Sequence, residues 1–473
     1  MGDKPMMARD FDNQNRMLWI NWNELIPKDH LLRKIDEMID FSFIYDKVEH
    51  LYSHTGRPSI DPVKLFKMTL IGYLYGIPSE RRLEEEVRLN LAYRWFVGLQ
   101  LDDPVPDHST FSQNRRRRYA DAGVYEEIFN HLVALCVERG LVTGELVVTD
   151  STHIKADVAS GKNETTIRVT TSPSEYLRAL DAEAERLDAE LKGRRKAKDK
   201  DGDDDNDNSD TQAGVTAKAP KTKEVKISKT DPDARLMHRT GKPRGYYYLA
   251  HQTIDTAHGI IVDVHTTPGN VNDHIPYGEA LERIQNTFAL NIKGAAADRA
   301  YDQVVVHRTL NRLGIKGYIP RHIKRGPAKT FRKDQFEYVA EGDFYRCPGG
   351  HKLSLNHISR TIGQKVYAAN AADCANCPLR AQCVPRSARV KHITRPFFQD
   401  DADITHSRIG TEEFKLAQRL RRIWAEGTFA VQKRLHNLGR ARMRGRKRVH
   451  EQSLMAAIAV NIKRMVKLTP QMA

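Results

Sequence analysis

Hydrophobic periodicity predicts that the first third of the chain is helical. Residues 56–77 form an amphipathic segment that ends at Pro78, and Ser79 begins a second one at 79–99. Between positions 125 and 136, apolar side chains recur at i, i+3 and i+4, the spacing of a helix with one buried face. We therefore expect residues 1–143 to form an all-helical N-terminal domain.

The middle of the chain has the short apolar runs of strands. Leu146–Val148 is β-branched enough to predict a buried strand that ends at Asp150. Two longer β-rich runs, GYYYLAHQTID and GIIVDVHTTPG, meet at Ala257–Gly259 and predict a hairpin. The pattern then alternates between helix and strand, in the segments 272–287, 292–298, 301–314 and 315–321. This order predicts an α/β fold with a mixed sheet flanked by helices, formed by residues 144–340 and 395–473.

Residues 160–229 interrupt this domain. Leucines along one side of residues 174–198 predict an exposed helix, whereas residues 199–226 have almost no large apolar side chain and are typical of a disordered linker. The acidic cluster at 201–210 lacks the glutamate that closes a calcium-binding EF-hand loop, which favours the linker over a calcium site.

Three acids are candidates for a metal site. Asp298, like Asp150, ends a short apolar run, so neighbouring strands would bring both carboxylates to one edge of the sheet, where they suit a hard divalent cation. For Asp150 alone, a strand followed by an Asx-type turn is the alternative. On the helix at 412–437, Arg422 and Lys433 lie at −4 and +7 from Glu426 and share its face. That face suits a metal-holding acid between phosphate-binding cations, or else a surface ion-pair row.

Four cysteines cluster in residues 341–394, which we expect to form a small cysteine-rich insertion. Cys347, Cys374, Cys377 and Cys383 have the spacing C-x26-C-x2-C-x5-C. Four thiolates suit tetrahedral structural zinc, with His351 as a substitute ligand. Reduced cysteines packed in the insertion and an iron–sulfur centre are the alternatives.

The net charge of +15 favours a phosphate backbone or an anionic membrane as partner. No apolar run approaches the ~20 residues of a spanning helix, and the polar N-terminus does not resemble a signal peptide. We therefore expect a cytoplasmic protein without membrane contact. The basic run near 115–118 is either a DNA contact or a solvated turn. The candidate DNA contacts are Arg115, Arg116, Arg117, Arg118, Arg419, Arg422, Lys433, Arg440, Arg442, Arg444 and Arg446.

These motifs together resemble the DDE transposases of bacterial insertion sequences. The acids lie in VVTDST (Asp150), AADRAYD (Asp298) and RRIWAEGTFAVQK (Glu426), and the last is similar to the family's Tyr-x2-Arg-x3-Glu-x6-Lys signature, with Arg419 in the tyrosine position. The segments GRPSIDPVKLFKMTLIGYLYGIPSERRLEEEV, DHSTFSQNRRRR, TDPDARLMHRTGKPRGYYYLAHQTID and GNVNDH also resemble this group.

The resemblance implies a ribonuclease-H-like fold in which the three acids hold two Mg²⁺ ions, with Mn²⁺ as an alternative. It also implies double-stranded DNA as partner, a homodimer, and a place on the bacterial nucleoid. The function it implies is cutting and joining DNA at insertion-sequence ends. The alternatives are an inactive DNA-binding protein derived from a transposase and a nuclease of the same fold that does not join strands.

Overall fold

The computed structural model describes residues 21–55, 59–118, 123–158, 164–170, 222–238, 243–322, 330–359 and 363–468. It divides into two compact units, which we describe separately. The first contains Met1–His131, Arg434–Asn437 and Ile458–Ala473; the second contains Leu132–Lys433 and Leu438–Ala457.

The first unit is helical in its described part. Its helices are α1 (Trp22–Leu25), α2 (Leu31–Met38), α3 (Phe43–Val48), η1 (Glu49–Leu51), α4 (Pro62–Leu74), α5 (Glu80–Leu89), α6 (Leu91–Val97), α7 (His108–Arg117) and the start of α8 (Val124–Glu138). Asp61 begins α4 by accepting hydrogen bonds from the backbone N–H groups of Val63 and Lys64, with proline at the first helical position. Residues 68–74 of α4 are all buried, so this helix is enclosed rather than amphipathic.

The segment at 79–99 is two helices rather than one. α5 ends and α6 begins at Asn90, whose side chain accepts a hydrogen bond from the backbone N–H of Tyr93. Asparagine can cap a helix with its side-chain oxygen, so it starts a new helix where periodicity alone predicts continuation.

A mixed six-stranded sheet forms the centre of the second unit. Its strands are β1 (Val147–Lys155), β4 (Arg235–Met237), β5 (Gly245–Asp255), β6 (Ile261–Pro268), β7 (Gly294–Ala296) and β8 (Lys316–Tyr318). The order is β4-β5-β1-β7-β8, and β6 also pairs with β5. β1 is antiparallel to β5, whereas β1, β7 and β8 run parallel. The predicted hairpin is β5 and β6, which turn at 256–260.

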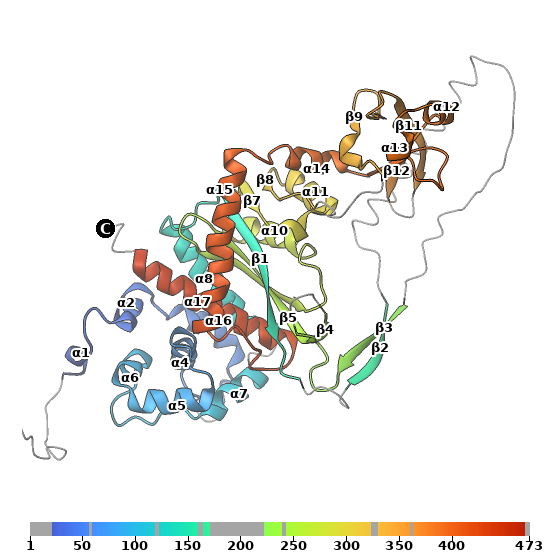
Figure 1. Cartoon of the computed structure of the whole chain (residues 1–473). Helices are drawn as coiled ribbons and strands as arrows, with labels where there is room; N and C mark the ends of the chain where they lie inside the picture. The colour runs from blue at the N-terminus through green and yellow to red at the C-terminus, as the bar shows by residue number, and fades with distance from the viewer. Residues whose placement is uncertain are drawn as a thin grey trace, which may run out of the picture. The chain divides into compact units, whose positions relative to one another are not determined.

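Helices lie around this sheet. They are α10 (Tyr277–Phe288), α11 (Val304–Arg312), α14 (Gln399–His406), α15 (Glu412–Arg421), η5 (Arg422–Glu426), most of α16 (Gly427–Leu435) and the first half of α17 (Arg446–Leu468), whose residues from Ile458 on belong to the first unit. α15 lies against β1, β7 and β8 (Figure 1). α11 is followed by Gly314 at φ +69°, as expected for a helix that closes at glycine. None of the helices in the described part of the chain is both long and apolar enough to cross a membrane.

A two-stranded ribbon lies in the stretch that we expected to interrupt the domain. β2 (Glu164–Thr170) pairs antiparallel with β3 (Thr222–Ser228), which the sequence pattern did not predict. The expected helix at 174–198, most of the expected linker and the acidic cluster lie outside the described residues.

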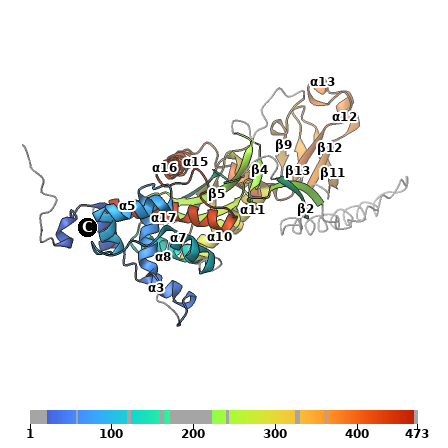
Figure 2. The same cartoon turned by 90° about the horizontal axis from the view of Figure 1, so that it is seen from below.

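A separate five-stranded antiparallel sheet contains the cysteines. Its order is β13-β12-β11-β10-β9, with β9 (Glu337–Val339), β10 (Phe344–Arg346), β11 (Lys352–Ser359), β12 (Gln364–Ala369) and β13 (His392–Pro396). The short helices α12 (Ala371–Ala375) and α13 (Arg380–Cys383) lie at one end of it (Figure 2). Its core includes Tyr345, Leu353 and Tyr367, together with Cys374 and Cys383.

Candidate active site

Asp150 and Asp298 occupy equivalent positions on two neighbouring strands. β1 and β7 are parallel, with Val148 opposite Ala296, and each aspartate lies two residues beyond this pair. Neighbouring strands are about 4.8 Å apart, so this register places the two acids side by side. The prediction that strand β1 ends at Asp150 is wrong. β1 continues to Lys155 because β5 pairs with it throughout, and Asp150 lies opposite Gln252.

Local backbone contacts orient each aspartate. The Asp298 side chain begins the 3-10 turn η2 (Arg299–Tyr301) by accepting a 2.8 Å hydrogen bond from the backbone N–H of Ala300. Asp150 accepts a 2.8 Å hydrogen bond from the backbone N–H of Ser151. Each carboxylate uses its Oδ1 atom in these bonds, so Oδ2 is the atom that can meet a further partner.

A fourth acid, Asp273, lies next to this pair. The hydroxyl of Ser151 donates a 2.7 Å hydrogen bond to it, and its side chain is buried. Burial raises the pKa of Tyr301, and Asp273, Asp150 and Asp298 raise it further, so all of them lie around this phenol. The sequence analysis did not select Asp273, although its motif GNVNDH was a signal that could have identified it.

Glu426 is linked to Asp150 through Arg421. The guanidinium of Arg421 contacts Oδ2 of Asp150 at 3.1 Å and Oε1 of Glu426 at 3.0 Å. The sequence predicted instead that Arg422 would neighbour Glu426. The π-helical turn η5 explains the difference, because its i→i+5 bonding brings residues five apart onto one face. Arg422 is exposed.

The electrostatics of the acids suit a cation. Burial raises the pKa of Asp150 to about 6; the Ser151 hydrogen bond and Arg421 lower it, while Asp298 and Glu426 raise it. A carboxyl that is costly to ionise in the protein alone gains strongly from a positive partner. Arg421 is that partner here.

Three carboxylates fit a hard divalent ion such as Mg²⁺ in donor chemistry. Among the residues that the structure describes, however, Asp150, Asp298 and Glu426 are not a group whose oxygens all lie within 4.8 Å of one another. Glu426 is also half exposed, with 55% of its side chain accessible. An ion held by all three acids would therefore need Arg421 to give up its place between Asp150 and Glu426.

Trp424 fixes the helical turn that presents Glu426. Its ring packs against Gly259 so closely that a Cβ there would lie 2.3 Å from the indole. Gly259 also has φ +77°, which favours glycine. The hairpin between β5 and β6 therefore contacts η5 directly.

The four cysteines gather at one end of the small sheet. A Cβ at Gly349 would lie 3.4 Å from Sγ of Cys377 and 3.6 Å from Sγ of Cys347. Burial raises the pKa of Cys383, Lys391 lowers it, and the thiols of Cys347, Cys374 and Cys377 raise it. All of these cysteines are free thiols.

The donor chemistry of this cluster fits zinc, but its spacing is wider than zinc requires. Zn–S bonds of ~2.3 Å in a tetrahedron place the sulfurs roughly 3.8 Å apart. Within the described part of the chain, no three of these sulfurs all lie within 4.8 Å of one another. Zinc binding would therefore draw the cysteines together.

The candidate DNA contacts lie in two places. In the first unit, α7 includes Arg115, Arg116 and Arg117, whose side chains lie outside the description. Arg118 donates a 2.8 Å hydrogen bond to Asn114 and lies over the ring of Tyr52. Asp107 caps α7 by accepting a hydrogen bond from the backbone N–H of Ser109.

In the second unit, several basic side chains are exposed: Arg419, Arg422, Lys433, Arg440, Arg444 and Arg446. Arg442 is half-buried. Arg440 and Arg444 both pair with Asp157, at 3.1 and 3.2 Å, just beyond the end of β1. Such exposed pairs contribute little to stability, so a phosphate could replace Asp157 at low cost.

Comparisons with known proteins identify the class. Residues 20–117 match the family model "Transposase domain (DUF772)", and residues 346–466 match "Transposase DDE domain". Both matches are to transposase domains, and together they are consistent with a DDE transposase of insertion-sequence type. The second match includes Glu426 and the four cysteines but neither Asp150 nor Asp298.

Among solved structures, the chain is similar to the piggyBac transposase in a synaptic complex with hairpin DNA. The identity is 10% and the TM-score 0.36, over 93% of this chain and 76% of that chain. A search of curated proteins finds no match.

Proposed function

We propose that this transposase cuts and joins DNA strands at the ends of an insertion sequence, using divalent metal ions held by Asp150, Asp298 and Glu426. The observation that carries the proposal is the β1–β7 register. It places Asp150 and Asp298, which are 148 positions apart in the sequence, at matching positions of neighbouring strands. The strand order of this sheet, with three antiparallel strands followed by two parallel ones, supports a ribonuclease-H-like catalytic domain.

In this proposal the three acids hold the metal ions from two sides of the site. Asp150 and Asp298 offer oxygens from the sheet edge, and Glu426 offers one from the exposed turn of η5. Two bound Mg²⁺ ions, or Mn²⁺ ions, would supply an activated water or 3′-hydroxyl and stabilise the leaving oxygen. Arg421 partly offsets the charge of two of the acids beforehand and, once displaced, would be free to contact a phosphate.

We infer that double-stranded DNA is the partner, held by the basic side chains named above as candidate contacts. Arg440, Arg444 and Arg446, which are exposed, lie in the same unit as the acids. The helical residues 1–143 form the second DNA-binding part of this proposal, and residues 144–340 with 395–473 the catalytic part. A homodimer would hold both ends of the element. Zinc in the cysteine-rich residues 341–394 has a structural role here.

The test is a duplex that carries the element's own end, incubated with Mg²⁺ and analysed for cut and joined products. Wild-type protein should give both, and Asp298→Asn should give neither while it still binds the duplex. Cut products without joined ones would favour the non-joining nuclease. Binding without any cutting by the wild type would favour a DNA-binding relic.

A further inference from the structure

A second cluster of metal-binding groups lies just after the turn that contains Asp298. Asp302 ends η2, and its Oδ1 atom lies 2.8 Å from Nε2 of His307 on α11 and 2.8 Å from Nε2 of His406 on α14. One donor atom from each of these residues lies within 4.8 Å of the other two. Three elements of the second unit thus converge on one point.

The cluster is buried. The side chain of His307 is 1% exposed, and those of Asp302 and His406 are each 11% exposed. Without a cation, both rings have to donate to a single carboxylate oxygen. Among the residues that the structure describes, the Nδ1 atoms of both histidines are buried without a hydrogen-bond partner.

Asp302 also accepts a hydrogen bond, through its other oxygen, from the backbone N–H of His322. The point of convergence therefore joins one carboxylate group and two imidazole nitrogens.

The cluster opens onto a cavity of about 490 Å³, which is large enough for water or a small anion to complete a coordination sphere. Two imidazole nitrogens and one carboxylate oxygen are the donor set of zinc and related transition ions, whereas the three acids at the sheet edge suit Mg²⁺. We propose that Asp302, His307 and His406 form a transition-metal site, for Zn²⁺ or an ion of similar preference, that is separate from both the acids and the cysteines.

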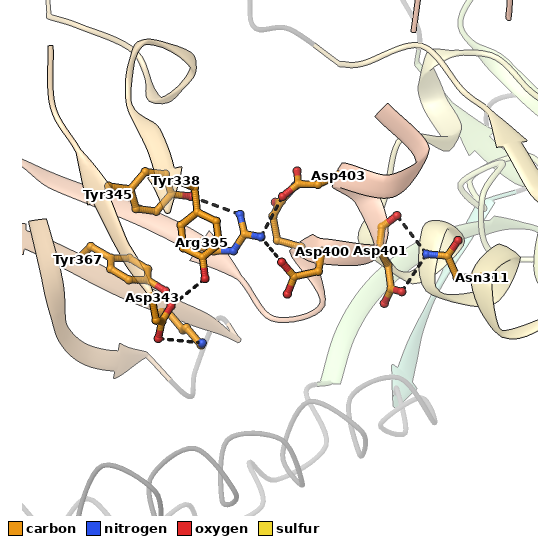
Figure 3. Close-up of polar contacts among 11 residues, drawn as sticks. Asn311, Tyr338, Asp343, Tyr345, Tyr367, Arg395, Asp400, Asp401 and Asp403 are labelled. Atoms are coloured by element: carbon orange, nitrogen blue, oxygen red, sulfur yellow. Dashed lines mark hydrogen bonds and ion pairs between the residues drawn. The ribbon is translucent and has the colours of Figure 1, made fainter. Parts of the chain in front are cut away.

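The surrounding contacts hold the ligands in place. Asn311 on α11 donates a 2.9 Å hydrogen bond to Asp401 on α14, which fixes the two histidine-bearing helices to each other (Figure 3). Arg395 on β13 pairs with Asp400 and Asp403 at the start of α14 (Figure 3). The bound ion thereby joins the turn that follows Asp298 to a helix that is itself fixed to the small sheet.

The cavity wall also determines what completes the site. Arg321, Arg332, Lys333 and Arg395 line it alongside Asp334 and Asp403. Burial and the neighbouring Arg395 lower the pKa of Lys333 to about 8. This excess of cations favours water, hydroxide or an anionic oxygen at the open coordination positions.

The experiment is a Co²⁺ titration of the full-length protein in excess Mg²⁺, which occupies hard oxygen sites. We expect cobalt bound by nitrogen and oxygen to absorb in the visible without near-ultraviolet charge transfer, whereas cobalt bound to the cysteines would show both. His406→Gln should weaken the nitrogen–oxygen site by more than about a hundredfold, because loss of an outer partner alone costs 10–100-fold. His322→Gln is the matched control, since His322 lines the same cavity but contacts Asp302 only through its backbone.

X-ray absorption at the cobalt edge of the wild-type protein decides the result even if His406→Gln does not fold. Imidazole and oxygen neighbours of the cobalt retained in excess Mg²⁺, alone or beside sulfur from cobalt at the cysteines, would establish the site. Sulfur neighbours only, no retained cobalt, or an unchanged nitrogen–oxygen site in a folded His406→Gln protein would each overturn the proposal. DNA cleavage plays no part in this test, so its outcome is independent of the proposed function.

Discussion

Removal of Arg421 should destabilise the metal-free protein and increase its response to Mg²⁺. The side chain is 12% exposed and bridges Asp150, which is 19% exposed, and Glu426, which is 55% exposed. The exposed Glu426 contact contributes at most ~1 kcal/mol. The Asp150 contact matters more, because a buried carboxylate that loses its cation costs roughly 3–5 kcal/mol if it stays ionised.

Protonation limits that cost. The pKa of Asp150 is already raised to about 6, and loss of Arg421 raises it further, so the acid takes up a proton instead of remaining charged. Because the protonated acid no longer needs a cation, the loss through Asp150 is limited to roughly 1.4 kcal/mol, for the one pH unit between its pKa of about 6 and pH 7; with the Glu426 contact, the net loss in Arg421→Met is about 1–2.5 kcal/mol. A raised pKa in the folded state means that stability is lost as pH rises, so the loss should shrink at pH 5.

Thermal unfolding at pH 5 and pH 7, with and without Mg²⁺, measures both effects. Arg422→Met is the control, because Arg422 is the adjacent residue and is exposed. Saturating Mg²⁺ at a hundred times its dissociation constant contributes about 2.7 kcal/mol and should restore much of the stability of Arg421→Met. Equal unfolding of the two variants without metal, or a stabilisation by Mg²⁺ that is at least as large in the wild type as in Arg421→Met, would refute this role of Arg421.

Three further predictions concern the same region and the cysteines. Gly259→Ala should lose at least ~1 kcal/mol from its positive φ and, in addition, displace Trp424 and reduce cleavage; Gly140→Ala, with φ +68° but nothing within 4 Å of its Cβ, should show the strain alone. Mg²⁺ binding by calorimetry should be about tenfold weaker at pH 5 than at pH 7, because a proton competes for Asp150, whose pKa is about 6; a flat profile would contradict this. Cys377→Ser should lower both the zinc content and the melting temperature, and unchanged metal analysis would exclude zinc at the cysteines.

Apolar runs in the sequence predicted the elements that bring the aspartates together. The run before Asp150 and the run before Asp298 both lie in the sheet, and their parallel pairing follows from the helix between the hairpin and β7. The hairpin itself was also predictable, because glycine at 259 follows a long β-rich segment. These features depend on burial and turn chemistry, which are local properties of the chain.

The remaining details depend on partners that are distant in sequence. Strand β1 continues through Ser151 and Thr152 because β5 pairs with it, although these polar residues alone indicate a turn. Arg421 rather than Arg422 contacts Glu426 because the π-helical turn shifts the register by one residue. Prediction from a regular period of 3.6 residues per turn assumes that no such shift occurs. It therefore named Arg422, the residue next to Arg421.

The most direct test of the central claim is strand cleavage by wild type and Glu426→Gln, each with Mg²⁺ and with a chelator. The substrate is a labelled duplex with the element's end, and binding is measured on the same samples. We predict Mg²⁺-dependent cleavage by the wild type and none by Glu426→Gln, with binding retained in both. Cleavage that persists in Glu426→Gln would remove this acid from the site, and cleavage that persists in the chelator would contradict the metal-dependent mechanism.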